Sequence, residues 1–172
     1  LLKKRLFSSP AAFAVTLEKH VKSVGIASGV AASGLLRQID DIDEEFANDE
    51  EYEETALEVV EVASKHLAKI SAEEKQLLSD LRNFASAASM QCDSKAICLI
   101  NWLKQNIKPD EKWSDRRVII FTEYRQTQKW LHGLLAAEGF VGENRLAMIY
   151  GGMPQEDRES IKAAFQAEPS ES

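Results

Sequence analysis

A short run of four apolar residues, Val118 to Phe121, constrains the fold of this chain more than any other feature. A continuous apolar run of this length is typical of a strand that is buried on both faces of a parallel sheet. Leu146 to Tyr150 forms a second run of this kind, and the stretch between the two runs has helical spacing. Two strands joined through a helix form a right-handed parallel crossover. The sequence therefore predicts a strand–helix–strand–helix unit from Arg116 to Phe165.

Upstream of this unit the sequence predicts helices. Pro10 suits the first turn of a helix over 11–24, which Ser8 or Ser9 can cap. A further helix is expected over 26–39, where alanines and glycines alternate with apolar residues. The predicted fold class is thus predominantly α-helical, with a partial α/β segment of two parallel strands at the C-terminal end.

Four further helices are also predicted. One begins near Glu53 and ends near Ile70, and Ser71 with Glu74 matches the capping box that starts the next. The short turn between these two helices predicts an antiparallel hairpin. The second helix would pack through one apolar face, made of Leu77, Leu78, Leu81, Phe84, Ala85 and Ala88. Asp93 or Ser94 can cap a third helix, and after the second predicted strand Pro154 opens a last one, with Ile161, Ala164 and Phe165 inward.

The charge of the chain is unevenly distributed. The formal net charge is −7, but 12 of the 28 acidic residues lie between Gln38 and Glu61, where no Lys or Arg occurs. The remaining residues carry 21 basic and 16 acidic side chains. Like charges repel one another and little apolar area is available, so an acidic loop is expected near 38–54. The mildly basic remainder is compatible with nucleic-acid contact.

The two cysteines, Cys92 and Cys98, are too few for a disulfide framework and have no histidine nearby. We expect them to be reduced and structural, with no metal site and a cytoplasmic location. No apolar run approaches the roughly 20 residues that a membrane-spanning helix needs, so no membrane partner is expected. Because the chain begins without Met, we interpret it as a fragment of a longer protein.

The residues after the two predicted strands are the best candidates for a ligand site, because ligands of parallel α/β proteins bind beyond the carboxyl ends of the strands. Each strand leads directly into a helix, whose N-terminal N–H groups suit a phosphate. A nucleic-acid backbone is a chemically suitable ligand, held without base readout. Alternatively, Gly151 and Gly152, which follow the second predicted strand, merely form a turn. The candidate residues are Thr122, Glu123, Tyr124, Arg125, Gly151 and Gly152.

A resemblance sharpens this prediction. The stretch RVIIFTEYRQTQKWLHGLL, followed by RLAMIYGGMPQEDRESIKAAF, resembles motif IV and the downstream Gly-Gly block of superfamily-two helicases. The segment DSKAICLINWLK resembles the region before motif IV in Swi/Snf-like ATP-dependent translocases. The start, KKRLFSSPAAFAVTLEKH, resembles the helical segment between the two RecA-like lobes in bacterial members of that group. The matching residues include Lys95, Arg117, Phe121, Thr122, Gly151, Gly152, Arg158 and Phe165.

The resemblance implies an inter-lobe helical region over residues 1–92 and the first part of the second RecA-like (helicase C-terminal) lobe over 93–172. It implies that the six candidate residues contact nucleic acid, as double-stranded DNA, through the parent protein. It implies structural roles for Phe121, Arg158 and Phe165. Lys95 would contact a phosphate or cap a helix end, and we favour the cap.

The sequence lacks several parts of a helicase motor. There is no G-x-x-x-x-G-K-[ST] loop to hold ATP phosphates and no Asp-Glu metal motif on a strand. The chain also ends before the place where the family has motifs V and VI, which include the arginine finger. We therefore expect this chain to have no catalytic residues and no cofactor of its own, while the parent protein binds ATP and Mg²⁺ and hydrolyses the ATP.

Two other functions remain open. The region from Ile26 to Met90 could be a helical interaction or regulatory module, whose acidic segment docks a basic protein partner. A stand-alone domain that binds a small molecule at Gly151–Gly152 ranks last, because two strands make too small a sheet for such a site.

Overall fold

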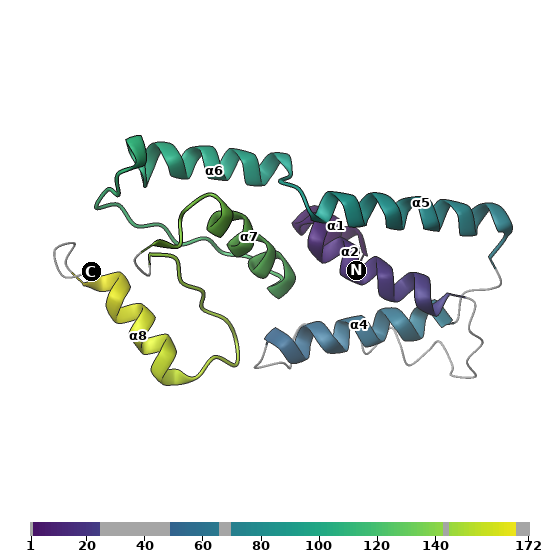
Figure 1. Ribbon diagram of the computed structural model, residues 1–172. Helices are drawn as coiled ribbons and strands as arrows, with labels where there is room; N and C mark the ends of the chain where they lie inside the picture. The colour runs from purple at the N-terminus through teal and green to yellow at the C-terminus, as the bar shows by residue number, and fades with distance from the viewer. Residues whose placement is uncertain (1, 25–48, 66–69, 143–144, 168–172) are drawn as a thin grey trace.

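The computed structural model describes residues 2–24, 49–65, 70–142 and 145–167, and these are mostly helical. This confirms the predominantly α-helical prediction. Within these ranges, no helix has both the length and the apolar character required to cross a membrane. The elements are α1 (Leu2–Ser8), α2 (Pro10–Ser23), α4 (Asp49–Lys65), α5 (Ala72–Ser89), α6 (Ser94–Asn106), the 3₁₀ turn η1 (Pro109–Glu111), α7 (Arg125–Ala137) and α8 (Gln155–Gln166) (Figure 1).

The predicted helix starts are confirmed by their caps. Ser9 caps α2, where its Oγ accepts a backbone N–H at 3.1 Å and Pro10 is the first helical residue. Ser71 and Glu74 form the capping box of α5, with bonds of 3.1 and 2.7 Å in the two directions. Asp93 caps α6, and its Oδ1 accepts a backbone N–H at 2.7 Å. These bonds satisfy amide groups that a helix start leaves open.

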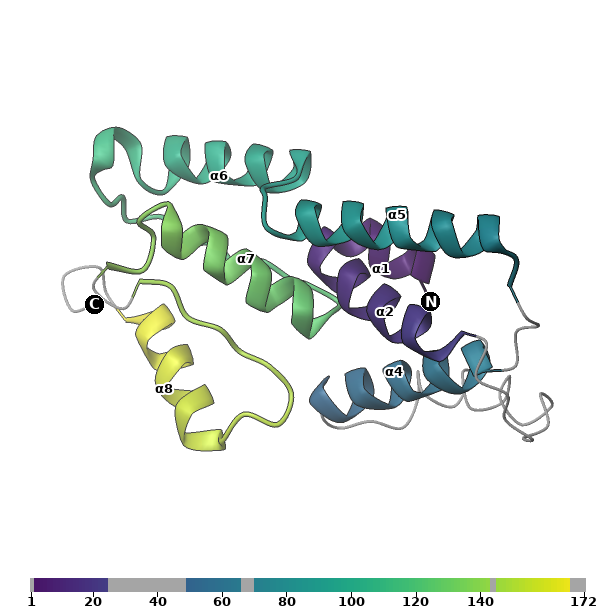
Figure 2. The same cartoon turned by 45° about the vertical axis from the view of Figure 1, so that its right-hand side comes forward.

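Helix α2 is the centre of the N-terminal half. Helices α1, α4 and α5 all pack against it, and it lies between α4 and α5 in both views (Figures 1 and 2). Phe13 and Leu17 of α2 form a buried cluster with Ala85 of α5. The predicted antiparallel hairpin of α4 and α5 is therefore wrong. The physical reason is that α2 buries a wide surface, with α4 packed on one side of it and α5 on the other. The two helices therefore bury their apolar residues against α2 and not against each other.

The predicted inward face of α5 is correct at Ala85 but wrong at its large apolar residues Leu77, Leu81 and Phe84. Ala85 is the only residue of α5 that is fully buried. Leu77 and Phe84 are 68% and 66% exposed. Because the small Ala85 makes the contact with α2, the larger apolar residues of α5 lie outside the α2–α5 contact.

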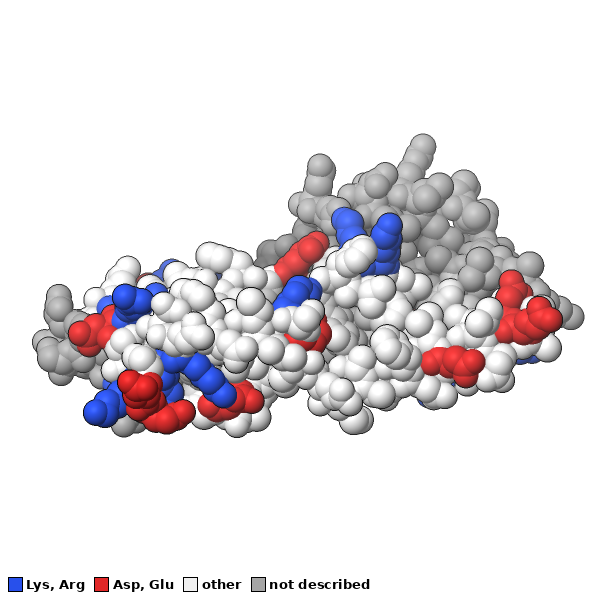
Figure 3. All heavy atoms as spheres, turned by 90° about the horizontal axis from the view of Figure 1, so that it is seen from above, with Lys and Arg blue, Asp and Glu red and all other residues white. Residues whose placement is uncertain are grey.

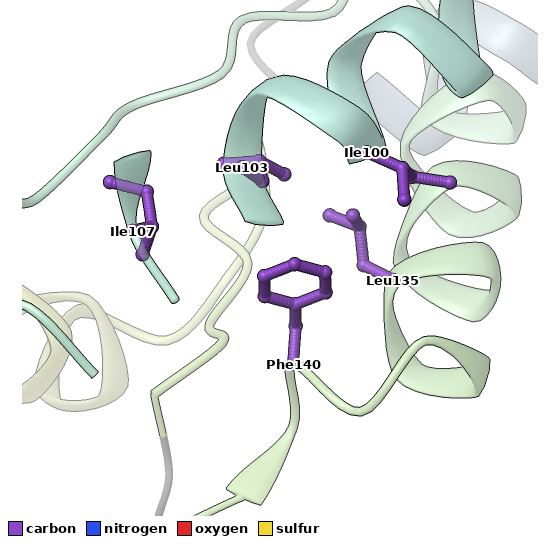
Figure 4. Packing of buried hydrophobic residues seen from close by; sticks show 5 residues of the cluster. All are labelled: Ile100, Leu103, Ile107, Leu135 and Phe140. Carbon is purple, nitrogen blue, oxygen red and sulfur yellow. The ribbon is translucent and has the colours of Figure 1, made fainter. Parts of the chain in front are cut away.

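A second hydrophobic cluster joins α6, α7 and the loop after α7. Its buried members are Ile100, Leu103, Ile107, Leu135 and Phe140, which point toward one another in Figure 4. Ile120 and Leu146, one from each predicted strand, pack against this cluster. The helical spacing predicted between the two runs is confirmed by α7, in which Thr127 and Leu135 are buried.

The two predicted strands are the main correction. In the described residues, Val118–Phe121 and Leu146–Tyr150 are extended segments but not β-strands. Ile120 is half-buried, whereas Ile119 and Phe121 are 59% and 89% exposed, so one face of the segment is covered and the other is open. A strand needs a neighbouring backbone for its N–H and C=O groups, and these two segments do not supply one another with a ladder. The predicted parallel crossover is therefore not formed.

Two further expectations are corrected at the ends of helices. Helix α4 begins at Asp49, so the acidic loop expected near 38–54 does not extend beyond residue 48. Burial of Ala56, Val59 and Val60 supports this helix, and acidic residues in a first turn favour a helix start. Helix α8 has no buried residue, contrary to the inward face predicted for it. The helix predicted over 26–39 and the acidic residues before Asp49 lie outside the described residues.

Candidate nucleic-acid interface

Tyr150 is the point at which α7, the extended segment before the glycines and α8 meet. The guanidinium carbon of Arg125 lies 3.6 Å from the centre of the Tyr150 ring. Gln128 Nε2 donates to the carbonyl oxygen of Ile149 at 2.9 Å. Arg158 Nη2 donates to the carbonyl oxygen of Tyr150 at 3.4 Å. The structure therefore brings the first residue of α7 beside the glycine pair, although no strand ladder holds them there.

The two glycines form a tight turn. The N–H of Met153 donates to the carbonyl oxygen of Tyr150 at 3.4 Å, and Gly152 has a φ of +82°. A positive φ at this position of a turn favours glycine, since a Cβ would strain it. Gly152 is exposed and Gly151 is half-buried, so the turn presents backbone to solvent next to Tyr150.

The residues between Phe121 and α7 differ in exposure. Thr122 is half-buried, and its hydroxyl makes no hydrogen bond within the part of the chain that the structure describes. Glu123 is exposed. Tyr124 is only 1% exposed, and the guanidinium of Arg5 lies 4.1 Å from the centre of its ring. The Tyr124 side chain therefore binds the N-terminal helices and is not available to a ligand.

The electrostatics favour an anion at the start of α7. This helix has no side-chain cap and no acidic residue in its first turn, so no group within the helix offsets the positive end of its dipole, and Glu123 just before it is the nearby acidic residue in the sequence. Arg125 is 8% exposed, and its Nε is buried without a hydrogen-bond acceptor among the described residues. In α8, by contrast, Glu156 and Asp157 occupy the first turn. The site is therefore most positive where α7 begins.

A second guanidinium contributes to this charge. Arg158 Nε is also buried and has no acceptor among the described residues. Within that part of the chain, neither Arg158 nor Arg125 forms an ion pair with a carboxylate. Each guanidinium donates from one nitrogen, Arg125 Nη1 to Gln128 Oε1 and Arg158 Nη2 to the carbonyl oxygen of Tyr150, whereas its Nε has no acceptor among the described residues.

The structure places the residues with expected structural roles as follows. Lys95 Nζ donates to the carbonyl oxygens of Phe7 and Ser8, at 2.5 and 2.8 Å, and so caps the C-terminal end of α1 as we favoured. Phe121 is 89% exposed and Phe165 is 39% exposed, so neither is a core residue. Arg117 lies over the Phe165 ring at 6.0 Å.

Sequence reasoning missed the contact that joins α7 to the N-terminal helices. Thr127 Oγ1 lies 2.7 Å from Ser8 Oγ and 2.8 Å from Ser9 Oγ. Trp130 Nε1 also donates to the carbonyl oxygen of Ser89 at 3.0 Å. Hydroxyl groups more than a hundred residues apart carry no pairing signal in a single sequence. The contact of Arg5 with the Tyr124 ring is equally distant in sequence and carries no such signal either.

Comparison of the chain with protein-family models, with curated proteins and with solved structures finds no match. Among the described residues, no group of three or more His, Cys, Asp or Glu side chains is arranged to hold a metal ion. The support for the candidate interface is therefore its geometry and the resemblance of its sequence motifs.

Proposed function

We propose that this chain is part of an ATP-dependent helicase or DNA translocase of superfamily two and contributes to its contact with the nucleic-acid backbone. The ligand is double-stranded DNA, and the chain itself is not catalytic. The division into an inter-lobe helical region over 1–92 and a motor-lobe segment over 93–172 belongs to the same proposal. ATP and Mg²⁺ would bind to other parts of the parent protein.

One observation carries the proposal: the uncapped start of α7 lies beside a buried arginine that has no carboxylate partner among the described residues. Helix N-terminal N–H groups and the positive charge of an arginine without a carboxylate partner together suit a phosphate. Thr122 adds a hydroxyl without a hydrogen bond in that part of the chain, and Gly152 adds exposed backbone. None of these groups reads a base, so the contact would be independent of sequence.

Glu123 sets the strength of this contact. It is exposed and lies two residues before Arg125, the first residue of α7. Its negative charge there repels a phosphate. The isolated chain should therefore bind DNA weakly, with a Kd in the range of about 10⁻⁴ to 10⁻⁶ M that is typical of non-specific contacts.

The test is a fluorescence-anisotropy titration of the 172-residue chain with two fluorescein-labelled duplexes of unrelated sequence, repeated at several salt concentrations. We expect similar affinity for both duplexes and a steep loss of affinity with salt. Arg125→Gln should weaken binding to both and reduce the salt slope by about 1. Glu123→Gln should strengthen binding by about two- to threefold.

Lys75→Gln is the matched control, because it removes an exposed positive charge from α5, away from the candidate interface. Circular dichroism of each variant separates lost binding from lost folding. The absence of affinity for either duplex in low salt, or an equal effect of Lys75→Gln and Arg125→Gln, would contradict the proposal.

A further inference from the structure

Helix α5 carries an apolar stripe that nothing in the described structure covers. The stripe consists of Leu77, Leu81 and Phe84, which are 68%, 41% and 66% exposed. Their spacing of four and then three residues places them in one line along the helix, as at the contact positions of paired helices. Large apolar side chains that line up in this way mark an interaction surface rather than scattered surface residues.

The two edges of the stripe differ. On one edge, α5 contacts α2 through Ala85, and Arg82 forms an ion pair with Glu18 at 2.5 Å. On the other edge, the helical positions next to the stripe hold Glu73 and Asp80 and no Lys or Arg. In Figure 3, which views the molecule from above, acidic atoms lie on the right-hand part of the described surface, where α5 runs, and most of them are toward its outer end.

We propose that this stripe binds an amphipathic helix of a partner protein, one that has an apolar stripe and basic residues along one edge. The apolar residues of the two helices would interdigitate, as in other complexes where a helix binds an apolar surface. Basic side chains of the partner would face the acidic edge of α5, and electrostatic complementarity of this kind selects the partner.

A second copy of the chain fits the stripe less well. In a two-fold symmetric pair the same surface meets itself, so two antiparallel α5 helices would set their acidic edges against each other. That arrangement brings Asp80 toward Asp80 of the second copy, and like charges are unfavourable there. The charge of the free edge therefore favours a different partner. This inference does not depend on nucleic-acid binding, because it uses other residues on another helix.

The experiment uses a fluorescein-labelled synthetic helical peptide with leucines at the same four-and-three spacing and lysines along one edge. A matched peptide has glutamates in place of the lysines. Each is titrated into the 172-residue chain and into the variants Phe84→Ser, Asp80→Lys and Val141→Ser. We expect the lysine peptide to bind, Phe84→Ser to weaken it by at least about tenfold and Asp80→Lys by about threefold.

Val141→Ser is the control, because Val141 is an apolar residue of α7's following loop that is 43% exposed and lies outside α5. This variant should bind the lysine peptide with unchanged affinity. Circular dichroism should show that all three variants keep the fold. Failure of the lysine peptide to bind, equal affinity for both peptides, or no effect of Phe84→Ser would overturn the proposal. Analytical ultracentrifugation that shows a dimer of the chain, dispersed by Phe84→Ser, would also overturn it in favour of a second copy.

Discussion

The helices around α2 and the segments near α7 both contain large apolar residues, but these residues differ greatly in burial. Leu17 and Phe13 of α2 are 1% and 6% exposed. Phe121, at the end of a run of four apolar residues, is 89% exposed, and Ile149 in the second run is 43% exposed. The difference shows that apolar content alone does not determine which residues form a core.

Backbone hydrogen bonding explains the difference. A helix satisfies its own N–H and C=O groups, so one neighbour on one side is enough to bury its apolar stripe. An extended segment must find a second backbone as well as a surface to cover each face. Val118–Phe121 has a cluster on one side, through Ile120, but no ladder partner among the described residues.

The largest expected effect comes from a paired substitution in the two regions. Leu17→Ala should lower the free energy of unfolding by about 2–5 kcal/mol, because it leaves a cavity against Ala85. Phe121→Ser should change it by no more than about 0.5 kcal/mol, because the ring is already exposed. Urea denaturation followed by circular dichroism measures both values. Comparable losses for the two variants would mean that the Phe121 ring is buried in solution.

The contact between the two regions should have the next largest effect. Thr127→Val keeps the shape of a buried side chain but removes the hydroxyl that lies within hydrogen-bond distance of Ser8 and Ser9. Loss of a buried hydrogen-bond partner costs about 1–3 kcal/mol, which urea denaturation would detect. The control is Thr122→Val, where no hydrogen bond within the described residues is lost. If both variants unfold at the same urea concentration, the hydroxyl contact does not join the regions.

A smaller effect concerns the pH dependence of the helices around α2. Ser64 Oγ donates to the carbonyl oxygen of Val60 at 2.5 Å, so its 2.6 Å contact with His20 requires the Nδ1–H of the imidazole to donate. Burial lowers the pKa of His20 below its ordinary value, because the charged form is poorly solvated there. The folded protein then binds this proton less readily than the unfolded chain does.

Stability should therefore be full above about pH 6.5, the usual pKa of histidine, and should fall as the pH drops through that value toward the lower folded pKa. Thermal unfolding between neutral and mildly acidic pH measures this. His20→Gln should remove part of the dependence, whereas His132→Gln in α7 should keep it. An unchanged pH profile in His20→Gln would show that other groups are responsible.

The smallest effect is expected at the surface of the same helices. Arg82→Gln removes an ion pair with Glu18 that links α5 to α2 at 2.5 Å. Both side chains are partly exposed, so the loss should be below about 1 kcal/mol and should shrink as salt is added. Urea denaturation at two salt concentrations provides the measurement. A loss that exceeds that of Thr127→Val would reverse the order of the two contacts.

Local signals in the sequence predicted much of the helical structure correctly. The caps at Ser9, Ser71 and Asp93 each depend on residues within three positions, and all three are present. Helix α1 was missed because its seven residues show no repeat of an apolar stripe. The predicted pairing of α4 with α5 was wrong, because a short turn in the sequence gives no information about the wide surface that α2 buries.

The candidate interface was predictable only as a set of loop residues. Its glycine turn followed from the residue type, and the positive φ of Gly152 agrees with it. The inward turn of Tyr124 and the stacking of Arg125 on Tyr150 depend on distant residues, which a single sequence does not pair. Strand pairing is non-local in the same way, and there the prediction was wrong.

The most direct test of the proposed nucleic-acid contact is an NMR titration of the ¹⁵N-labelled 172-residue chain with an unlabelled DNA duplex in low salt. The amides of Thr122, Arg125, Gly151 and Gly152 should shift as DNA is added, while those of α5 stay in place. Addition of salt should reverse the shifts, because the contact is electrostatic. Shifts confined to other helices, or none at any DNA concentration, would contradict the account.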